Sequence, residues 1–313
     1  MKKDLYASSM SELRLVLKDE HVSLEQRRKA GNVGKVLTLI FTYIFLAFVG
    51  LIMIFPFYWM IITSLKTGAE IQRTIPTFWP QTFRWENYAD ALSTLQFGYI
   101  IRNTLIVGIF STLGTLVTTI LAAFAFARLE FKGKNVIFMV LLATMMIPGE
   151  MMVISNYQSV SLMGLTGGKS ATNSYIAMII PFMISVFYIY LLRQNFKQIP
   201  NELYLAAKVD GKSDWQFLWK VMVPLAMPTL TTILILKLMG TWNAYKWPAL
   251  VVSGNEQLYL ITNALRDNFQ ANDPDSSGKQ MAAVMITTLP LILVFIFARK
   301  YIMKGVSRAG IKG

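Results

Sequence analysis

Side chains that could carry out a reaction are scarce in this sequence of 313 residues. The chain contains no cysteine, so neither a disulfide nor a thiolate metal site can form. Its one histidine, His21, lies among charged neighbours in a polar N-terminal segment, which favours a surface residue over a base or a metal ligand. No nucleophile stands near a histidine, and no two carboxylates share one apolar segment. We therefore expect no catalytic residue, no metal site and no enzymatic activity.

One glycine-rich sequence, GGKS at residues 167–170, invites comparison with a phosphate-binding loop. That loop requires a glycine five residues before its second glycine, and Met163 occupies this position here. No strand is predicted before the sequence, so a flexible turn is favoured. We expect this chain to bind no cofactor and no ATP itself. The energy for any ATP-driven work would come from another subunit.

Glu150 and Lys237 are the two charged residues inside the long apolar segments. An ionisable side chain in a bilayer is costly unless it faces a cavity or a partner. One interpretation places the two residues as a pair in a translocation path, since Glu150 follows the helix-breaking Pro148-Gly149. The other places Glu150 at the outer interface, while Lys237 extends toward the membrane surface or forms a structural ion pair. Both interpretations stay open from the sequence.

The sequence contains six apolar segments that are each long enough to cross a bilayer, which takes about 20 residues. Glu150 lies in the third of them and Lys237 in the fifth. Hydrophobic residues make up 54% of the chain and charged residues 15%, which excludes disorder and argues against a soluble domain. The predicted fold class is an all-α polytopic membrane protein with six transmembrane helices. Prolines in five of the six spans indicate bends or kinks. The predicted spans cover residues 36–62, 103–127, 135–154, 174–192, 221–242 and 281–298.

The basic residues set the predicted orientation of these spans. A net charge of +13 could indicate a nucleic-acid partner, so the distribution of lysine and arginine is decisive. With the N-terminus placed inside, 21 of the 30 basic residues lie in the four inner segments and 8 in the three outer ones. This positive-inside bias accounts for the charge with membrane lipid and no nucleic acid as partner. It also places both termini and the 193–220 loop in the cytoplasm.

Residues 200–224, in this loop and the start of the next span, have helix signals where a plain connector would suffice. Pro200 suits the first turn of a helix. Leu203, Ala206 and Ala207 then fall on one face. A short helix with an alanine-rich face lets its backbone approach a partner closely, so we predict a docking helix.

Turn and cap signals follow this predicted helix. Asp210-Gly211 can end it, because glycine tolerates the left-handed conformation common after a helix C-terminus. Ser213 and Gln216 then predict a capping box that opens a second helix.

The spacing of Ala206-Ala207, Gly211 and the sequence VMVP at residues 221–224 is similar to the EAA loop of ABC-importer permeases. In that family the loop is a cytoplasmic coupling helix that docks on the ATPase subunit. Leu205 stands where the family usually has glutamate, which bears on a specific salt bridge and not on the docking geometry. The residues to which the resemblance assigns ATPase coupling are Pro200, Glu202, Leu205, Ala206, Ala207, Asp210 and Gly211.

Other segments resemble the carbohydrate-uptake branch of these permeases, the maltose-permease type. The order of TSLK at 63–66, a proline-rich passage at 76–80 and ENY at 86–88 is similar to that branch. Residues 242–248 match its W-N-x-x-x-W-P passage, and residues 304–313 resemble its glycine-rich terminal strand, which reaches into the ATPase dimer. The resemblance implies an ABC type I importer permease fold. It assigns a second ATPase contact to Lys304, Gly305, Gly310 and Lys312.

Trp242, Asn243 and Tyr245 lie at the predicted outer end of the fifth span. An aromatic belt is expected there, and a docking surface is equally compatible. Sugar rings also stack on aromatic faces, so a place in the translocation path beside Glu150 and Lys237 is the other interpretation.

The resemblance implies a permease subunit of an ATP-driven ABC importer. It would form half of the translocation pathway for a sugar or oligosaccharide, in the plasma membrane of a bacterium or archaeon. The implied partners are a second permease subunit, two ATPase subunits that hold ATP and Mg, and an extracytoplasmic solute-binding protein. Predicted domains are a cytoplasmic tail at 1–35, a transmembrane domain at 36–298 that includes the 193–220 coupling loop, and a cytoplasmic tail at 299–313.

Two alternatives remain. The first is an ABC permease for another solute, such as a glycerol phosphate or a polyol. The second is a stand-alone secondary transporter, which would require inverted repeats and an organised ion relay. One glutamate and one lysine give little support to such a relay.

Overall fold

The computed structural model describes residues 35–269, 273 and 275–310. His21 and all of the predicted N-terminal tail except Lys35 lie outside these residues. Over the described ranges the chain forms helices and turns with no strand. It divides into two compact units, Met1–Met60 and Ile61–Gly313.

The described part of the first unit is almost entirely one apolar helix. This helix runs from Lys35 to Ser64, and the predicted span at 36–62 falls within it. Its large apolar side chains are exposed on all sides, with Phe41 71% and Leu51 68% accessible. A helix that is apolar all round is suited to a lipid environment. Pro56 lies inside the helix without breaking it.

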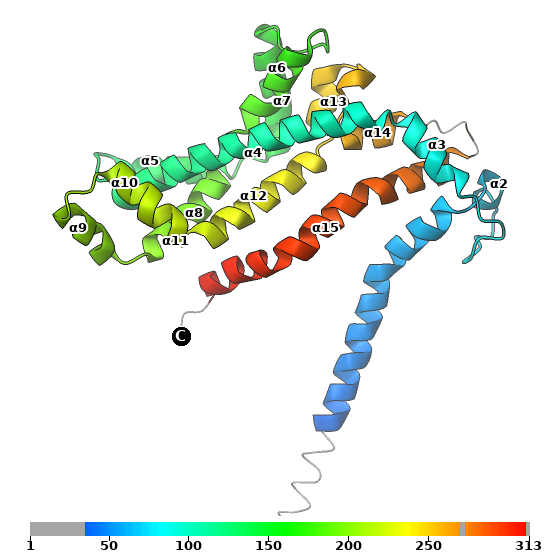
Figure 1. Ribbon diagram of the computed structural model, residues 1–313, viewed down its shortest axis with the longest axis horizontal. Helices are drawn as coiled ribbons and strands as arrows, with labels where there is room; N and C mark the ends of the chain where they lie inside the picture. Colours follow the sequence, from blue (N-terminus) through cyan, green and yellow to red (C-terminus); the bar gives the residue numbers. More distant parts are fainter. Residues whose placement is uncertain (1–34, 270–272, 274, 311–313) are drawn as a thin grey trace, which may run out of the picture. The chain divides into compact units, whose positions relative to one another are not determined.

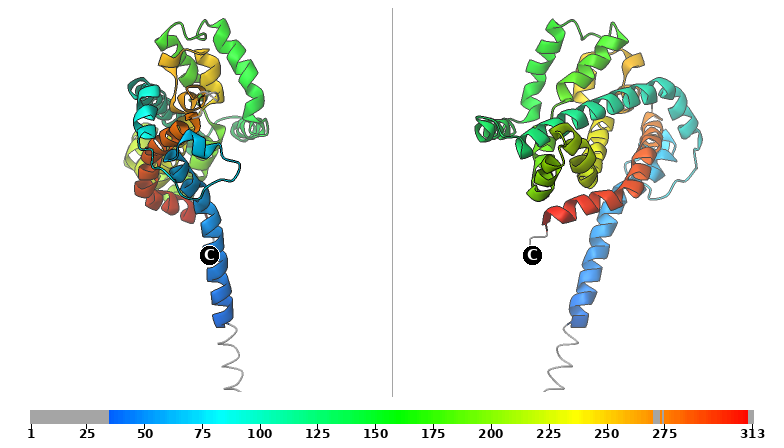
Figure 2. Two further views of the ribbon diagram at one scale, coloured as in Figure 1. Left: turned by 90° about the vertical axis from the view of Figure 1, so that its right-hand side faces the viewer. Right: turned by 60° about the vertical axis from the view of Figure 1, so that its left-hand side comes forward.

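The second unit is built along the long helix α4 (Phe97–Arg128). Helix α12 (Met227–Trp242) packs against α4, and the 35-residue helix α15 (Ser276–Gly310) packs against α12 (Figures 1 and 2). The shorter elements α2 (Gly68–Ile71) and α3 (Glu86–Thr94) precede α4 and contact α15. These contacts bring segments from both ends of the unit together.

Three of the six predicted spans are bent in the structure. Helix α5 (Lys134–Thr144) turns by 87° into the segment Gly149–Leu162, which comprises η1 (Gly149–Met152) and α6 (Val153–Leu162). The segment Ala171–Phe182 turns by 48° into α8 (Val186–Gln198), and the segment Asp214–Leu225 turns by 77° into α12. The described residues thus hold three single helices long and apolar enough to cross a membrane, or up to six spans if each bent pair is one span.

Proline accounts for the position of these bends. It has no N–H to donate and its ring clashes with the preceding turn, so it favours a helix start over a helix interior. Pro148 immediately precedes η1, Pro181 lies in η2 (Ile180–Phe182) after α7 (Ala171–Ile179), and Pro228 lies in the first turn of α12. Pro290 lies inside α15 without a break, so proline alone does not determine a bend.

At the bend after η2, side chains from other helices donate hydrogen bonds to backbone carbonyl groups. A break in the helical ladder leaves carbonyl groups that need new partners, because the bilayer core offers no water. Thr115 and Thr118 of α4 donate to the carbonyls of Phe182 at 3.1 Å and Met183 at 2.6 Å. The ammonium group of Lys237 also donates to the Phe182 carbonyl, at 2.8 Å. These contacts hold the bend against α4 and α12.

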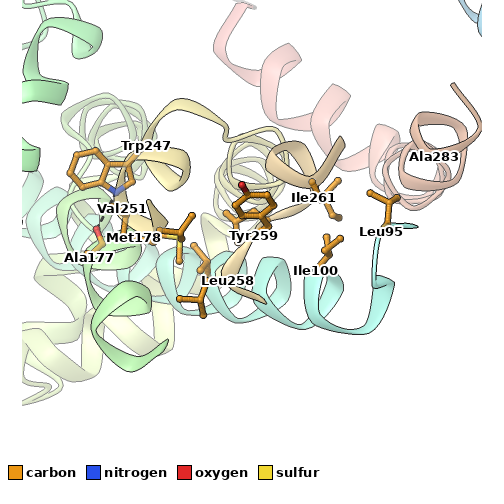
Figure 3. Packing of buried hydrophobic residues seen from close by; sticks show 14 of the residues in the cluster. Leu95, Ile100, Ala177, Met178, Trp247, Val251, Leu258, Tyr259, Ile261 and Ala283 are labelled. Carbon is orange, nitrogen blue, oxygen red and sulfur yellow. Dashed lines mark hydrogen bonds between the residues drawn. The ribbon is translucent and has the colours of Figure 1, made fainter. Parts of the chain in front are cut away.

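A hydrophobic cluster joins α3 and the first half of α4 to α13 (Lys246–Val252), α14 (Ile261–Asp267) and α15. Figure 3 shows this packing, in which Trp247 donates from its indole N–H to the Ala177 carbonyl over 3.1 Å. Between α13 and α14 lies the short η4 (Glu256–Leu258). The cluster fixes the position of α13 and α14 against α7.

A second hydrophobic cluster lies at the other end of α4. It includes the fully buried Phe196 of α8 and Phe217 of α10 (Asp214–Phe217). The chain continues through η3 (Leu218–Met222) and α11 (Val223–Leu225) into α12. Helix α9 (Asn201–Val209) lies beside α10 (Figure 1). Its residues Tyr204 and Ala207 pack on this second cluster.

The expected terminal strand is wrong over the residues that the structure describes. Helix α15 continues through Lys304 and Gly305 to Gly310, and Lys312 lies outside the described residues. A glycine in a helix costs only about 1 kcal/mol relative to alanine. The neighbouring methionine, lysine, arginine and alanine residues are good helix formers, so two glycines do not convert this segment to a strand.

Candidate functional sites

Arg128 holds the start of α9 in place. This residue ends α4 and donates to the carbonyls of Phe196, at 2.9 Å, and Ile199. It also donates to the side-chain oxygen of Asn201 at 3.2 Å. Pro200 adopts an extended conformation and is the residue before α9, which begins at Asn201. Arg128 has no distinctive signal in the sequence, because a basic residue at the end of a span is a common interfacial anchor.

Gly211 ends α9 in the way that the sequence predicts. Its φ of +72° is left-handed, a conformation that glycine adopts without strain. The N–H groups of Gly211 and Lys212 donate to the carbonyls of Lys208, at 3.0 Å, and Ala207, at 2.9 Å. This is the double hydrogen bond of a Schellman motif.

The predicted capping box opens α10. The backbone N–H of Ser213 donates to the Gln216 side chain, and that of Gln216 donates to the Ser213 hydroxyl, both at 3.2 Å. Asp214 then accepts from the Tyr204 hydroxyl at 2.7 Å and pairs with Lys208 at 2.8 Å. The hydrogen bond to Asp214 raises the pKa of Lys208. Two turns of α9 are thereby tied to α10.

The outer face of α9 is not covered by the other residues that the structure describes. Leu205 is 56% and Val209 88% accessible. No basic side chain of the described residues lies within the 4.0 Å of an ion pair with the exposed Glu202. Of the proposed ATPase-coupling residues, those exposed are Pro200, Glu202, Leu205, Ala206, Asp210 and Gly211, while Ala207 is half-buried.

A cavity of about 710 Å³ opens between α4, η1, α12, α13 and α14. Four of the five residues considered for the translocation path line it, namely Glu150, Lys237, Asn243 and Tyr245. Trp242 does not. It lines a separate cavity of about 150 Å³ beside α4 and α15 and packs on the hydrophobic cluster shown in Figure 3.

The charged partners in the 710 Å³ cavity differ from the pair considered in the sequence analysis. Glu150 pairs with Lys246 at 2.7 Å, whereas Lys237 donates to the Phe182 carbonyl. Sequence distance hides this pairing, since α13 comes 96 residues after Glu150. Both cations and the carboxylate nevertheless line one cavity.

Arg266 is a further cavity residue that the sequence analysis missed. It extends from α14, and its guanidinium lies 4.4 Å from the centre of the Tyr245 ring. Its signal in the sequence is weak, because an arginine in an outer polar segment is ordinary. Among the described residues there is no group of three or more histidine, cysteine or acidic side chains placed to hold a metal ion.

Comparison with known proteins is consistent with this geometry. Residues 114–308 match the family model described as "Binding-protein-dependent transport system inner membrane component". The arabinooligosaccharides transport system permease protein AraQ of Bacillus subtilis is 28% identical, over 86% of this chain and 94% of that protein. The lactose transport system permease protein LacG of Rhizobium radiobacter is 30% identical, over 84% and 93%.

A solved structure shares the fold. It is the crystal structure of a bacterial ABC transporter involved in the import of alginate, with a TM-score of 0.73 and 24% identity. The match covers 84% of this chain and 95% of that chain.

Proposed function

We infer the function from one premise: this chain belongs to the family of binding-protein-dependent transport system inner membrane components. It is a permease subunit of an ATP-driven importer and forms half of the translocation pathway. The solute is a sugar or oligosaccharide delivered by an extracytoplasmic binding protein. Support for this solute class comes from relatives named for arabinooligosaccharide and lactose transport.

The exposed helix α9 is the main support for coupling between this chain and an ATPase subunit. Its outer face is uncovered, while Arg128 and Asp214 fix it to α4 and α10 on the inner side. A partner that moves α9 would therefore move helices of the core as one body. We propose that α9 docks on an ATPase subunit, and that Lys304, Gly305 and Gly310 of α15 provide a second contact.

The complete transporter then contains a second permease subunit, two ATPase subunits and the binding protein, in a bacterial or archaeal plasma membrane. ATP and Mg are held by the ATPase subunits. The cavity that contains Lys237 and Tyr245 is this chain's half of the path. An anionic solute such as a glycerol phosphate is the second candidate, and it is favoured by the basic residues in that cavity.

Reconstitution tests the function. The chain is co-expressed with candidate permease, ATPase and binding-protein subunits, and the purified complex is placed in liposomes. We expect saccharide uptake that needs both ATP and the binding protein. Uptake without ATP, driven by an ion gradient, would contradict the proposal and indicate a secondary transporter.

A further inference from the structure

The cavity of about 710 Å³ has an excess of positive charge. Three basic side chains line it, Lys237, Lys246 and Arg266, against the single lining carboxylate of Glu150. Glu150 pairs with Lys246 at 2.7 Å, so this pair is close to neutral. Lys237 and Arg266 form no ion pair with the described residues, so they are the two cavity cations without a bound carboxylate.

Lys237 retains hydrogen-bonding capacity toward the cavity. Its ammonium group has three N–H donors, and one is directed to the Phe182 carbonyl at 2.8 Å. Within the described ranges, no carboxylate lies within the 4.0 Å of an ion pair with Lys237. A lysine inside a membrane span is costly without a counter-charge. The described residues therefore leave room for an anionic partner at Lys237.

Arg266 is positioned by an aromatic ring rather than by an acid. Its guanidinium lies over Tyr245 at 4.4 Å from the ring centre. The adjacent Asp267 lies 3.5 Å from the Tyr245 hydroxyl and is not among the cavity-lining residues. Stacking uses the face of a guanidinium and leaves its N–H edge available for two parallel hydrogen bonds to a carboxylate or phosphate.

We propose that Lys237 and Arg266 bind an anionic group of the transported solute, so that the importer carries a saccharide bearing a carboxylate or a phosphate. This inference rests on the proposed function and narrows its solute class. Tyr245 provides the aromatic face for a sugar ring, and the two cations bind the acidic substituent. A cavity of this size accommodates a part of an oligosaccharide chain within this subunit.

Two matched pairs of probes test the inference on the complete complex with its binding protein in nanodiscs. Trigalacturonate is compared with its methyl ester, and glucose 1-phosphate with methyl glucoside. The readout is solute-stimulated ATP hydrolysis. We expect the charged member of one pair to stimulate about tenfold more than its neutral partner, as a charge-assisted hydrogen bond implies. The pair that responds distinguishes carboxylate from phosphate.

Variants of this chain test whether its own residues cause the preference for the charged probe. Lys237→Met and Arg266→Met should each remove most of the preference for the charged probe, and Lys237→Arg should retain most of it. Lys169→Met, at an exposed position outside the cavity, should match the wild type. If Lys237→Met fails to assemble, Arg266→Met still tests the inference, because Arg266 is exposed and its substitution should not disturb the fold.

The inference is overturned if the wild type prefers the neutral probes or responds to none of the four. It is also overturned if the variants lower the responses to both members of a pair alike, as expected for cations that pair with the second permease subunit. ATP-driven uptake of neutral saccharides without any charge preference would refute this inference alone. Absence of ATP-driven uptake for every saccharide would refute the proposed function.

Discussion

The hydroxyl group of Tyr204 donates a hydrogen bond of 2.7 Å to the carboxylate of Asp214, which joins the exposed helix α9 to the first turn of α10. Lys208 binds the same carboxylate from the next turn of α9. Helix α10 ends at Phe217, whose side chain is buried in the second hydrophobic cluster. The two hydrogen-bonded residues therefore connect the proposed docking surface to the core.

Weakening this connection should reduce coupling more than assembly. Tyr204→Phe removes one of the contacts of α9 with the Asp214 carboxylate, and Asp214→Ala removes both. Because these groups are largely exposed, we expect each substitution to lower the stability of the fold only slightly. The number of ATP molecules hydrolysed per solute transported should rise, while co-purification with ATPase subunits stays near the wild-type level.

The exposed Tyr190, whose hydroxyl makes no contact with Asp214, provides the control. Tyr190→Phe should leave the ratio of hydrolysis to transport unchanged. An equal ratio in Tyr204→Phe and Tyr190→Phe would show that the contact with Asp214 has no role in coupling.

Substitutions of Gly211 should act through the backbone. A Cβ atom at this position would meet nothing within 4 Å, so the cost comes from the φ of +72°. Valine in the left-handed region is disfavoured by about 1–2 kcal/mol or more, whereas asparagine is tolerated there. Gly211→Val should lower both the ATPase co-purified with the complex and the uptake. Gly211→Asn should retain most of both, and equal behaviour of the two variants would contradict the assigned role.

Features that depend on local sequence patterns could be predicted, whereas pairings between residues far apart in the sequence could not. The six apolar segments, the Gly211 stop and the Ser213–Gln216 capping box depend on residues a few positions apart, so their signals are present in the sequence. Arg128 binds residues about 70 positions later, and Glu150 pairs with a lysine 96 positions away. Nothing local indicates such partners. The terminal strand was expected from the resemblance of residues 304–313 to a glycine-rich strand, and two glycines have only a small effect on a helix.

Gly168 offers a steric test of the outer loop. Its φ is +63°, and a Cβ atom would lie 2.4 Å from the Val252 carbonyl oxygen. Gly168→Ala should therefore cost about 2–4 kcal/mol from backbone strain and overpacking together. The measurement is the thermal unfolding midpoint of the purified complex.

Gly164 is the matched control for Gly168. Its φ is +71°, but a Cβ atom there meets nothing within 4 Å. Gly164→Ala should show the backbone cost alone, about 1–2 kcal/mol. If the two alanine variants unfold at the same temperature, the close packing of Gly168 on α13 is incorrect.

An acidic group at the start of α15 predicts a pH dependence of stability. The Arg84 guanidinium, together with the N–H of Gly68 at 2.8 Å, holds the pKa of Asp275 below its usual value of 3.8. A lowered pKa in the folded state stabilises the fold fully above the unfolded pKa, and this contribution disappears as the pH falls through the folded pKa.

The wild type should therefore unfold at a higher temperature than Asp275→Asn at pH 7. The difference between the two midpoints should shrink below about pH 4. When Arg84→Met is already present, adding Asp275→Asn should change the unfolding midpoint only slightly at every pH. If the difference in unfolding midpoint between the wild type and Asp275→Asn stays constant or grows toward pH 3, the assigned role of this ion pair is wrong.

Docking of α9 on an ATPase subunit is the central claim, and site-directed cross-linking tests it most directly. The chain has no cysteine, so a single introduced cysteine is unique in it. In the assembled complex, Ala206→Cys on the exposed face of α9 should cross-link to an ATPase subunit, and Lys169→Cys in the outer loop should not. Cross-linking from Lys169→Cys, or none from Ala206→Cys in a complex that still contains the ATPase, would contradict the account.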